Sequence, residues 1–151
     1  MRSIVTGAGQ DSSYLAEFLL SEGHEVFCLT RRSCTANNWR LAKAKDSPNF
    51  HFLECDITDA GAVDRMVNDI QADEFYNLAA QSHVGTSFTN PKATWDSVAV
   101  GPLNILEAIK LLSPHTKYYQ ASSSEMYGDM LSIEDDGGYC HIRYSNCNSY
   151  T

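Results

Sequence analysis

The first 34 residues carry the pattern that most constrains the fold of this chain. Ile4 and Val5 lead into the turn Thr6–Ser13, apolar residues at helical spacing follow, and a second apolar run covers Val26–Leu29. A strand, a glycine turn, a helix and a strand in this order form the mononucleotide-binding unit of a doubly wound α/β fold. The pattern therefore predicts a parallel sheet with a dinucleotide site at the first turn.

The glycine turn has the features that a pyrophosphate site needs. Gly7 lets the chain turn sharply, Gly9 lets the backbone approach the phosphates, and the following helix N-terminus attracts an anion. The third position of the fingerprint is Ser12 instead of glycine, so we expect slightly looser packing of helix against strand there.

The second strand ends in Thr30-Arg31-Arg32-Ser33, where an NAD site usually carries an acidic residue. Two guanidinium groups and a hydroxyl suit a 2′-phosphate, which favours NADP over NAD. A solvated arginine pair behind an ordinary glycine turn is the alternative. The preceding strand, the helix and the spacing favour nucleotide binding.

Composition restricts the partners more than the fold. The 151 residues carry a formal net charge of −8, which argues against a nucleic-acid partner and against an anionic membrane surface. No apolar run is long enough for a membrane span, and the five cysteines form no C-x-x-C pair, so we expect a cytoplasmic protein with Cys28 and Cys55 as buried thiols. Cys140, His141 and Cys147 lack a second close ligand pair, so we expect no metal site.

Further strands alternate with helical segments along the chain. Strands are predicted at 50–54, 74–78 and 117–121, and Asp59 is a good N-cap for the helix between the first two. Asn90-Pro91 predicts the start of a long helix to about Leu112, with a kink or a division into two helices at Gly101-Pro102. This alternation predicts helices on both faces of the sheet.

Ligands of doubly wound sheets bind at the carboxyl ends of the strands. Five segments fall at those ends: Gly7–Asp11, Arg31–Ser33, Asp56–Ile57, Leu78–Ser82 and Ser122–Glu125. In the last segment a hydroxyl could hold a substrate oxygen, and the carboxylate could take a carbon-bound proton beside a ketone. Taken alone, three serines and a glutamate are better explained as a polar loop.

Several segments together resemble the GDP-mannose 4,6-dehydratases, which belong to the extended short-chain dehydrogenase/reductases. They read TGAGQDSSYLAEFLL, LTRRS, CDITD, YNLAAQSHV and YQASSSEMYG, and the resemblance runs from about Ser3 to Gly128. It implies an NADP-binding Rossmann-like domain over 1–128 and a divergent tail over 129–151. The family's C-terminal substrate domain has no counterpart in these residues.

The resemblance also implies a reaction in nucleotide-sugar metabolism, on the route to GDP-fucose. NADP takes a hydride from carbon 4 of GDP-mannose, water is lost from carbons 5 and 6, and the hydride returns to carbon 6 to give GDP-4-keto-6-deoxymannose. The glutamate that removes the carbon-5 proton falls on Glu125, and the hydroxyl that holds the sugar oxygen falls on Ser123. A homo-oligomer is expected. The cofactor-binding positions fall on Gly7, Ala8, Gly9, Gln10, Asp11, Arg31, Arg32, Ser33, Asp56, Ile57, Leu78, Ala79, Ala80, Gln81 and Ser82.

The chain departs from the family pattern at several positions. The glycine loop is one residue shorter, Ala93 stands where a tyrosine is common, and Pro102 replaces an ordinary helix residue. No Y-x-x-x-K pair follows the Ser-Glu segment: Tyr139 is followed by Arg143, Tyr144 by Asn148, and Tyr150 by a single residue. Two alternatives therefore stay open, an NADP-dependent sugar-nucleotide epimerase or reductase, which would not need Glu125, and a non-catalytic NADP-binding module.

Overall fold

A computed structural model describes residues 1–32, 38–81, 83–122, 130–135 and 140–144. The chain divides into two compact units, Met1–Ala121 and Ser122–Thr151. In the second unit, β6 (Met130–Asp135) pairs antiparallel with β7 (Cys140–Tyr144), a hairpin that the sequence pattern did not predict. The division into a domain over 1–128 and a tail over 129–151 stays a prediction.

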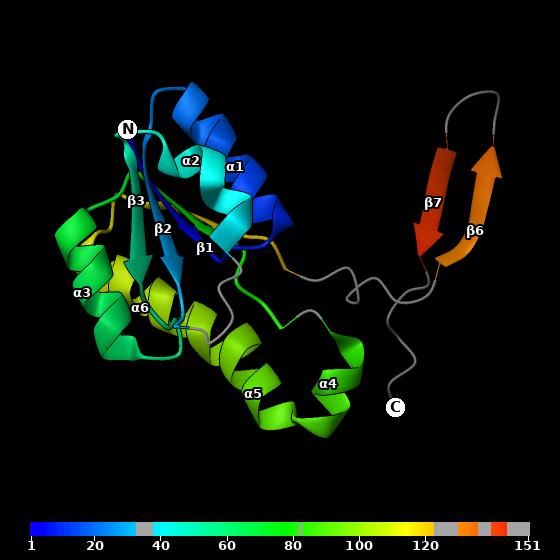
Figure 1. The fold of residues 1–151 in the computed structure, drawn as a ribbon. Coiled ribbons are helices and arrows are strands. Elements are labelled where there is room, and N and C mark those ends of the chain that lie inside the picture. Colours follow the sequence, from blue (N-terminus) through cyan, green and yellow to red (C-terminus); the bar gives the residue numbers. More distant parts are fainter. Residues whose placement is uncertain (33–37, 82, 123–129, 136–139, 145–151) are drawn as a thin grey trace. The chain divides into compact units, whose positions relative to one another are not determined.

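The first unit is built on a five-stranded sheet in the order β3-β2-β1-β4-β5 (Figure 1). All four strand pairs are parallel, which confirms the predicted doubly wound sheet. The order reverses between β1 and β4, the switch point at which such sheets bind ligands. The strands are β1 (Arg2–Thr6), β2 (Glu25–Thr30), β3 (Phe50–Glu54), β4 (Glu74–Asn77) and β5 (Lys117–Gln120).

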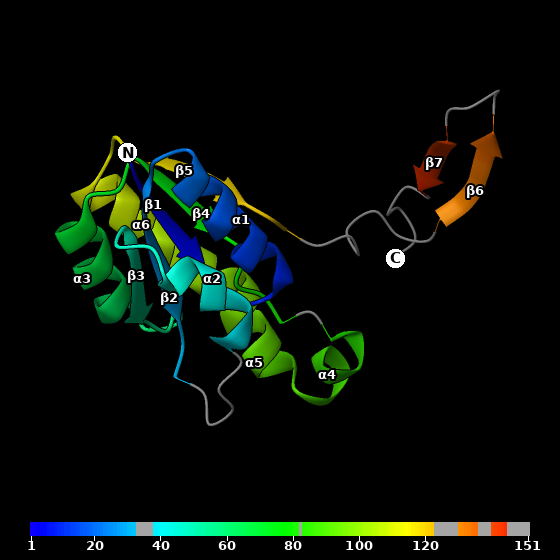
Figure 2. The same ribbon diagram turned by 45° about the horizontal axis from the view of Figure 1, so that its top comes forward.

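Helices cover both faces of this sheet, as the alternating pattern predicted (Figure 2). One face carries α1 (Gln10–Ser21) and the short α2 (Ala42–Lys45), which follows a 3-10 turn, η1 (Asn38–Leu41). The other face carries α3 (Ala60–Ile70) and α6 (Gly101–Leu112). No helix in the described part of the chain combines the length and the apolarity that crossing a membrane requires.

The two faces bury different amounts of apolar surface. The cluster between the sheet, α3 and α6 includes the fully buried Phe75 and Ile105, whereas the cluster under α1 has four buried members. The members of the smaller cluster are Val5, Ala16, Leu19 and Val26. Most of the hydrophobic stabilisation therefore comes from the α3–α6 face.

Cys28 and Cys55 are free, buried thiols, as the sequence predicted. Burial raises the pKa of Cys28 to about 12, against a small opposing effect of Lys45. Burial, with the nearby carboxylate of Asp56, raises the pKa of Cys55 to about 11. Both thiols are therefore protonated at neutral pH and poor nucleophiles.

The helix starts follow the predicted caps. Asp59 Oδ1 accepts a hydrogen bond of 3.1 Å from the Ala62 N–H at the start of α3. Asn90 Oδ1 accepts one of 3.4 Å from the Ala93 N–H, with Pro91 in the first turn of α5 (Pro91–Trp95). Side-chain acceptors at these positions replace the intrahelical partners that the first N–H groups lack.

The segment predicted to kink or to divide at Gly101-Pro102 contains two helices joined by an irregular turn. A π-helical turn, Asp96–Val100, joins α5 to α6, and the Gly101 N–H bonds to the Asp96 carbonyl. Because proline cannot donate a hydrogen bond, a wider turn accommodates it without ending the helical conformation. Gly101 also packs directly on Ile57, since a Cβ at this position would lie 2.5 Å from Ile57 Cδ1.

Candidate functional site

The glycine loop connects β1 to α1 at the carboxyl edge of the sheet. Gly7 has φ +93°, a conformation that favours glycine, and its N–H donates to the Leu29 carbonyl at 2.9 Å. The loop is therefore tied to the end of β2. Gly9 is the N-cap of α1 and provides no side-chain cap, so the first N–H groups of this helix are available to an anion.

Ser12, at the third fingerprint position, packs against the inner side of the glycine loop. Its side chain is buried, and its Oγ donates to the Gly9 carbonyl at 3.3 Å. A Cβ on Gly7 would lie 3.6 Å from Ser12 Oγ, an ordinary contact. The serine thus fits beneath the loop, and the backbone conformation, more than lack of space, requires glycine at position 7.

A polar ladder beneath the loops joins the ends of three strands, with Thr6 and Asn77 buried and Gln120 exposed, and the sequence analysis missed it. Thr6 and Asn77 are fully buried, and the Thr6 hydroxyl donates to Asn77 Oδ1 at 2.6 Å. Thr6 Oγ1 also accepts the N–H groups of Leu78 and Ala79, each at 3.0 Å. One hydroxyl therefore holds the loop after β4 against the last residue of β1.

The ladder continues to β5. Asn77 Nδ2 donates to Gln120 Oε1 at 2.8 Å, and the Tyr118 hydroxyl donates to the same oxygen. Burial raises the pKa of Tyr118, partly offset by its hydrogen bond with Asn77. In the parallel register Thr6 lies beside Asn77, and Asn77 beside Gln120. A polar residue at the end of each of three strands was the signal, but only the strand order shows that these residues are neighbours.

The arginine pair after β2 is exposed at the same edge. Arg32 Nε lies 3.8 Å from Glu54 Oε1, with 89% and 61% of the two side chains exposed. Ion pairs this open contribute little. Arg31 takes part in none of the ion pairs of the described residues. Both guanidinium groups could therefore reach a ligand phosphate, and Ser33 lies outside the described residues.

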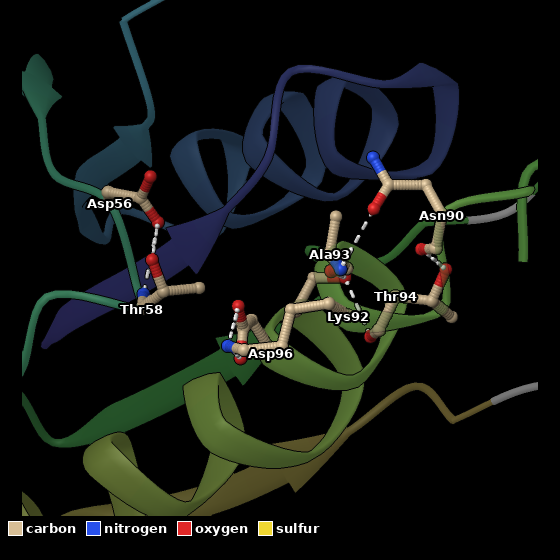
Figure 3. A network of polar contacts seen from close by, with 8 residues as sticks. Asp56, Thr58, Asn90, Lys92, Ala93, Thr94 and Asp96 are labelled. Atoms are coloured by element: carbon tan, nitrogen blue, oxygen red, sulfur yellow. Dashed lines mark hydrogen bonds and ion pairs between the residues drawn. The ribbon is translucent and has the colours of Figure 1, made fainter.

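The segment after β3 is held by its own turn and by α6. Asp56 Oδ1 accepts from the N–H and the hydroxyl of Thr58 at 3.0 and 2.9 Å (Figure 3). The Ile57 side chain is buried in the larger core, and its carbonyl accepts from Asn104 Nδ2 at 3.0 Å. Ile57 thus anchors this loop, and contact with a ligand at Asp56–Ile57 stays a prediction.

Figure 3 also shows the start of α5, where Lys92 Nζ lies 2.5 Å from Asp96 Oδ1. The pair is one helical turn apart, and Asp96 begins the π-helical turn. The Lys92 side chain is 80% exposed, so this ion pair adds at most about 0.3–0.5 kcal/mol to helix stability. Neither residue was predicted to bind a ligand.

The loop after β4 contains the one buried side-chain oxygen or nitrogen that lacks a partner among the described residues. Gln81 Nε2 donates to the His83 carbonyl at 2.9 Å, but Gln81 Oε1 has no hydrogen bond. A buried acceptor without a donor is costly, unless a ligand or water supplies the donor. The ribose hydroxyls or the carboxamide N–H of a dinucleotide could supply the donor that this oxygen lacks. The predicted stretch Leu78–Gln81 lies at this edge, and Ser82 falls outside the described residues.

His83, to which the sequence assigned no chemistry, has a structural role. It caps α4 (Val84–Thr89), an unpredicted helix, because its Nδ1 accepts from the Thr86 N–H at 3.2 Å. The proposed catalytic pair, Ser123 and Glu125, lies outside the described residues, as do Tyr139 and Tyr150. No cluster of three or more metal-ligating side chains occurs among the side chains that the structure describes.

The strand order, the glycine loop at the switch point and helices on both faces define a Rossmann-like α/β protein. Residues 4–136 match the family described as GDP-mannose 4,6 dehydratase. The chain belongs to this family, and the family resemblance predicted from its motifs is confirmed.

Similar proteins agree with this assignment. The GDP-mannose 4,6-dehydratase of Vibrio cholerae is 46% identical over 139 residues, which are 87% of this chain and 37% of that protein. The enzyme of Yersinia enterocolitica is also 46% identical, over 87% of this chain and 38% of its own length. The chain therefore spans less than two fifths of these relatives. UDP-glucose 4-epimerase of Thermus thermophilus, solved in complex with NAD, aligns with a TM-score of 0.70 and 28% identity over 92% of this chain and 42% of that one.

Proposed function

We propose that this chain carries the NADP-binding part of a GDP-mannose 4,6-dehydratase. The observation behind the proposal is that the family match over residues 4–136 includes every described loop at the carboxyl edge of the sheet. Three groups on those loops have no partner among the described residues and could bind a dinucleotide. They are the N–H groups at the uncapped N-terminus of α1, the exposed Arg31 and Gln81 Oε1. The predicted cofactor-binding residues are proposed on the same grounds.

NADP is proposed over NAD because of the charge at the end of β2. The Thermus neighbour is a complex with NAD, which supports a nicotinamide dinucleotide of either kind at this fold. Arg31 and Arg32 follow β2 with exposed side chains, and a guanidinium group can form bidentate hydrogen bonds with a phosphate. An unphosphorylated ribose would leave this pair without a ligand partner.

The proposed reaction converts GDP-mannose to GDP-4-keto-6-deoxymannose with loss of water. Bound NADP supplies an acceptor for the carbon-4 hydride and later returns that hydride to carbon 6. Glu125 is proposed to take the carbon-5 proton, and Ser123 to donate a hydrogen bond to the sugar oxygen. Both residues follow β5, whose last residue Gln120 is held by Asn77.

A non-catalytic NADP-binding module is the second candidate. It is favoured by one observation, the lack of a Y-x-x-x-K pair after Glu125 in these 151 residues. The Vibrio and Yersinia dehydratases are 46% identical to this chain, whereas the Thermus epimerase is 28% identical, so the epimerase or reductase alternative has weaker support.

The proposal includes a homo-oligomer in the cytoplasm. Three large apolar side chains of α5 and α6 are exposed, namely Trp95 at 63%, Leu103 at 57% and Leu106 at 45%, and such surface often marks an interface. The free thiols Cys28 and Cys55 suit a reducing compartment. Light scattering after gel filtration measures the oligomeric state directly.

Calorimetric titration with NADP⁺ and NAD⁺, repeated on Arg31→Ala, tests the cofactor proposal. We expect NADP⁺ to bind more tightly than NAD⁺ and the variant to lose this preference, because the guanidinium that it lacks is proposed to bind the 2′-phosphate. Incubation with GDP-mannose followed by mass spectrometry tests the reaction through the loss of one water. NADP⁺ binding without that loss would favour the non-catalytic module, and binding of neither nucleotide would refute both.

A further inference from the structure

The turn after β3 is joined to α6 by two contacts of Ile57. Asn104 Nδ2 donates to the Ile57 carbonyl at 3.0 Å, across 47 positions of the chain. The Ile57 side chain packs on Gly101, where a Cβ would lie 2.5 Å from Ile57 Cδ1 and 2.7 Å from Cγ1. One residue of the turn is therefore held by α6 through both its backbone and its buried side chain.

The π-helical turn before α6 determines which residues of this helix meet Ile57. Gly101 and Asn104 are three positions apart, a spacing that places them on one face of the helix. The turn Asp96–Val100 adds a residue relative to an α-helix, so that everything after it is rotated by about 100° relative to α5. A continuous α-helix from α5 would thus turn this face away from Ile57. Single π turns within helices are frequent at functional sites, which favours a role beyond packing.

Asp56, the neighbour of Ile57, has one carboxylate oxygen fixed and one open. Its Oδ1 accepts from the N–H and the hydroxyl of Thr58 (Figure 3), and its carbonyl accepts from the Asp59 N–H at 3.0 Å. Asp56 is exposed, and its Oδ2 has no hydrogen bond or ion pair among the residues that the structure describes. The turn therefore leaves one acceptor oxygen for a donor such as an amine.

The strand order places this acceptor beyond the end of β2. The strand β3 pairs with β2 on the side away from β1, and its last residue, Glu54, lies beside Thr30. A dinucleotide on a doubly wound sheet has its adenosine ribose at the end of β2, so the base extends toward the next strand. Adenine carries an exocyclic amine, a donor that a carboxylate oxygen can accept.

We propose that Asn104 is a positioning residue for base recognition, because by holding Ile57 it keeps the Asp56 carboxylate directed at the adenine amine of NADP. The inference rests on the proposed function, since it assumes that the glycine loop binds NADP. It gives control over base preference to α6, a helix that contains none of the predicted cofactor-binding residues.

Titrations with NADP⁺ and with its hypoxanthine analogue test this inference, because the analogue has a carbonyl oxygen in place of the adenine amine. The wild type should bind NADP⁺ about tenfold more tightly than the analogue, as for one hydrogen bond to a charged acceptor. Asn104→Leu, which has a similar volume and no donor, should reduce this preference to about twofold, mainly through weaker NADP⁺ binding. Asn104→Gln keeps the amide donor on a side chain one carbon longer and should retain more of the preference.

Asn68→Leu is the matched control. Asn68 lies on the exposed side of α3, where its Nδ2 donates to the neighbouring Asp69 Oδ1 at 3.1 Å, so this variant should keep the full preference. Circular dichroism melting curves verify that each variant is folded. If Asn104→Leu does not fold, Asn104→Ser takes its place, because the serine hydroxyl is too short to reach the Ile57 carbonyl.

The base preference separates positioning from general support of the fold. Equal losses of affinity for NADP⁺ and the analogue in Asn104→Leu would overturn the inference, because Asn104 would then stabilise the site as a whole. An unchanged preference in this variant, or a wild type that binds both nucleotides equally well, would also overturn it and leave NADP binding intact. A wild type that binds neither nucleotide would overturn both the inference and the proposed function.

Discussion

The polar side chains at the two edges of the parallel sheet differ in how completely they are paired. At the amino edge Arg2 Nε donates to Glu25 Oε2 at 3.1 Å, and His51 Nε2 lies 3.0 Å from the other oxygen of the same carboxylate. At the carboxyl edge Arg32 has one loosely held ion-pair partner, and the buried Gln81 Oε1 has no hydrogen-bond partner among the residues that the structure describes.

Further polar groups of the amino edge are paired within the chain. The Ser3 hydroxyl lies 2.8 Å from His24 Nδ1, and Asp73 Oδ2 accepts the Arg2 N–H at 2.7 Å. At the carboxyl edge the corresponding internal bonds lie one layer deeper, in the ladder of Thr6 and Asn77. The polar groups of the amino edge thus mainly stabilise the fold. At the carboxyl edge buried hydrogen bonds hold the loops in place, and the polar groups above them are left for a ligand, as a binding site requires.

The largest effect is expected for Thr6→Val, which removes the hydroxyl from the base of the carboxyl edge. Two N–H groups and the Asn77 amide oxygen lose their partner in a buried position, so the free energy of unfolding should fall by about 3 kcal/mol. Urea denaturation measures this loss. Thr6→Ser keeps the hydroxyl and should cost much less; equal losses would show that packing of the methyl group matters instead.

A matched pair of glycines compares the edges directly. Gly7 at the carboxyl edge has φ +93°, and Gly23, in the turn before β2, has φ +82°. Alanine at either position should lower the free energy of unfolding by about 1–2 kcal/mol, because both backbones are left-handed. Only Gly7→Ala should also weaken NADP⁺ binding in calorimetry. A similar loss of affinity in Gly23→Ala would contradict the functional division between the edges.

Cys28 lies beneath the glycine loop, where its Sγ donates to the Gly7 carbonyl at 3.3 Å. Ionisation of this thiol should make the free energy of unfolding depend on pH in the alkaline range. Its folded pKa, about 12, is above the ordinary value of 9.0. Its contribution is therefore complete below pH 9.0 and is lost as the pH rises toward 12, since the unfolded thiol ionises first. From about pH 8 to 10 the wild type should lose about 1 kcal/mol more than Cys28→Ala in urea denaturation. Parallel pH profiles of the two proteins would argue against this linkage.

The smallest effect is expected at the amino edge, for Asp73→Asn. The hydrogen bond from the Arg2 N–H lowers the pKa of Asp73 below its ordinary value of 3.8. Its stabilising contribution is present above that value and is lost as the pH falls through the folded pKa. Melting temperatures should therefore differ slightly between wild type and variant at neutral pH and converge in acid. NADP⁺ affinity should not change, and a change would mean that the edges are coupled.

Much of the fold followed from local patterns in the chain. The glycine turn after Val5, the cap at Asp59 and the cap at Asn90 predicted elements that the structure contains. Each depends on a few neighbouring residues, because capping and turn conformation are short-range effects. At Gly101-Pro102 the local rule predicted a kink or a division into two helices, and the structure has two helices, α5 and α6, joined by a π-helical turn. The close packing of Gly101 on Ile57 could not be read from the local sequence.

What the sequence determined by itself was the family, the parallel sheet and the loops that lie at its carboxyl edge. Only the tertiary structure decided how those loops are supported and which side chains lack partners. Thr6, Asn77 and Gln120 are far apart in the chain and form one ladder only because β1, β4 and β5 are adjacent. Asn104 and Ile57 likewise meet only because two separate segments pack side by side. Hydrogen bonding and burial depend on distances in space, and spacing along the chain fixes these only within a single element.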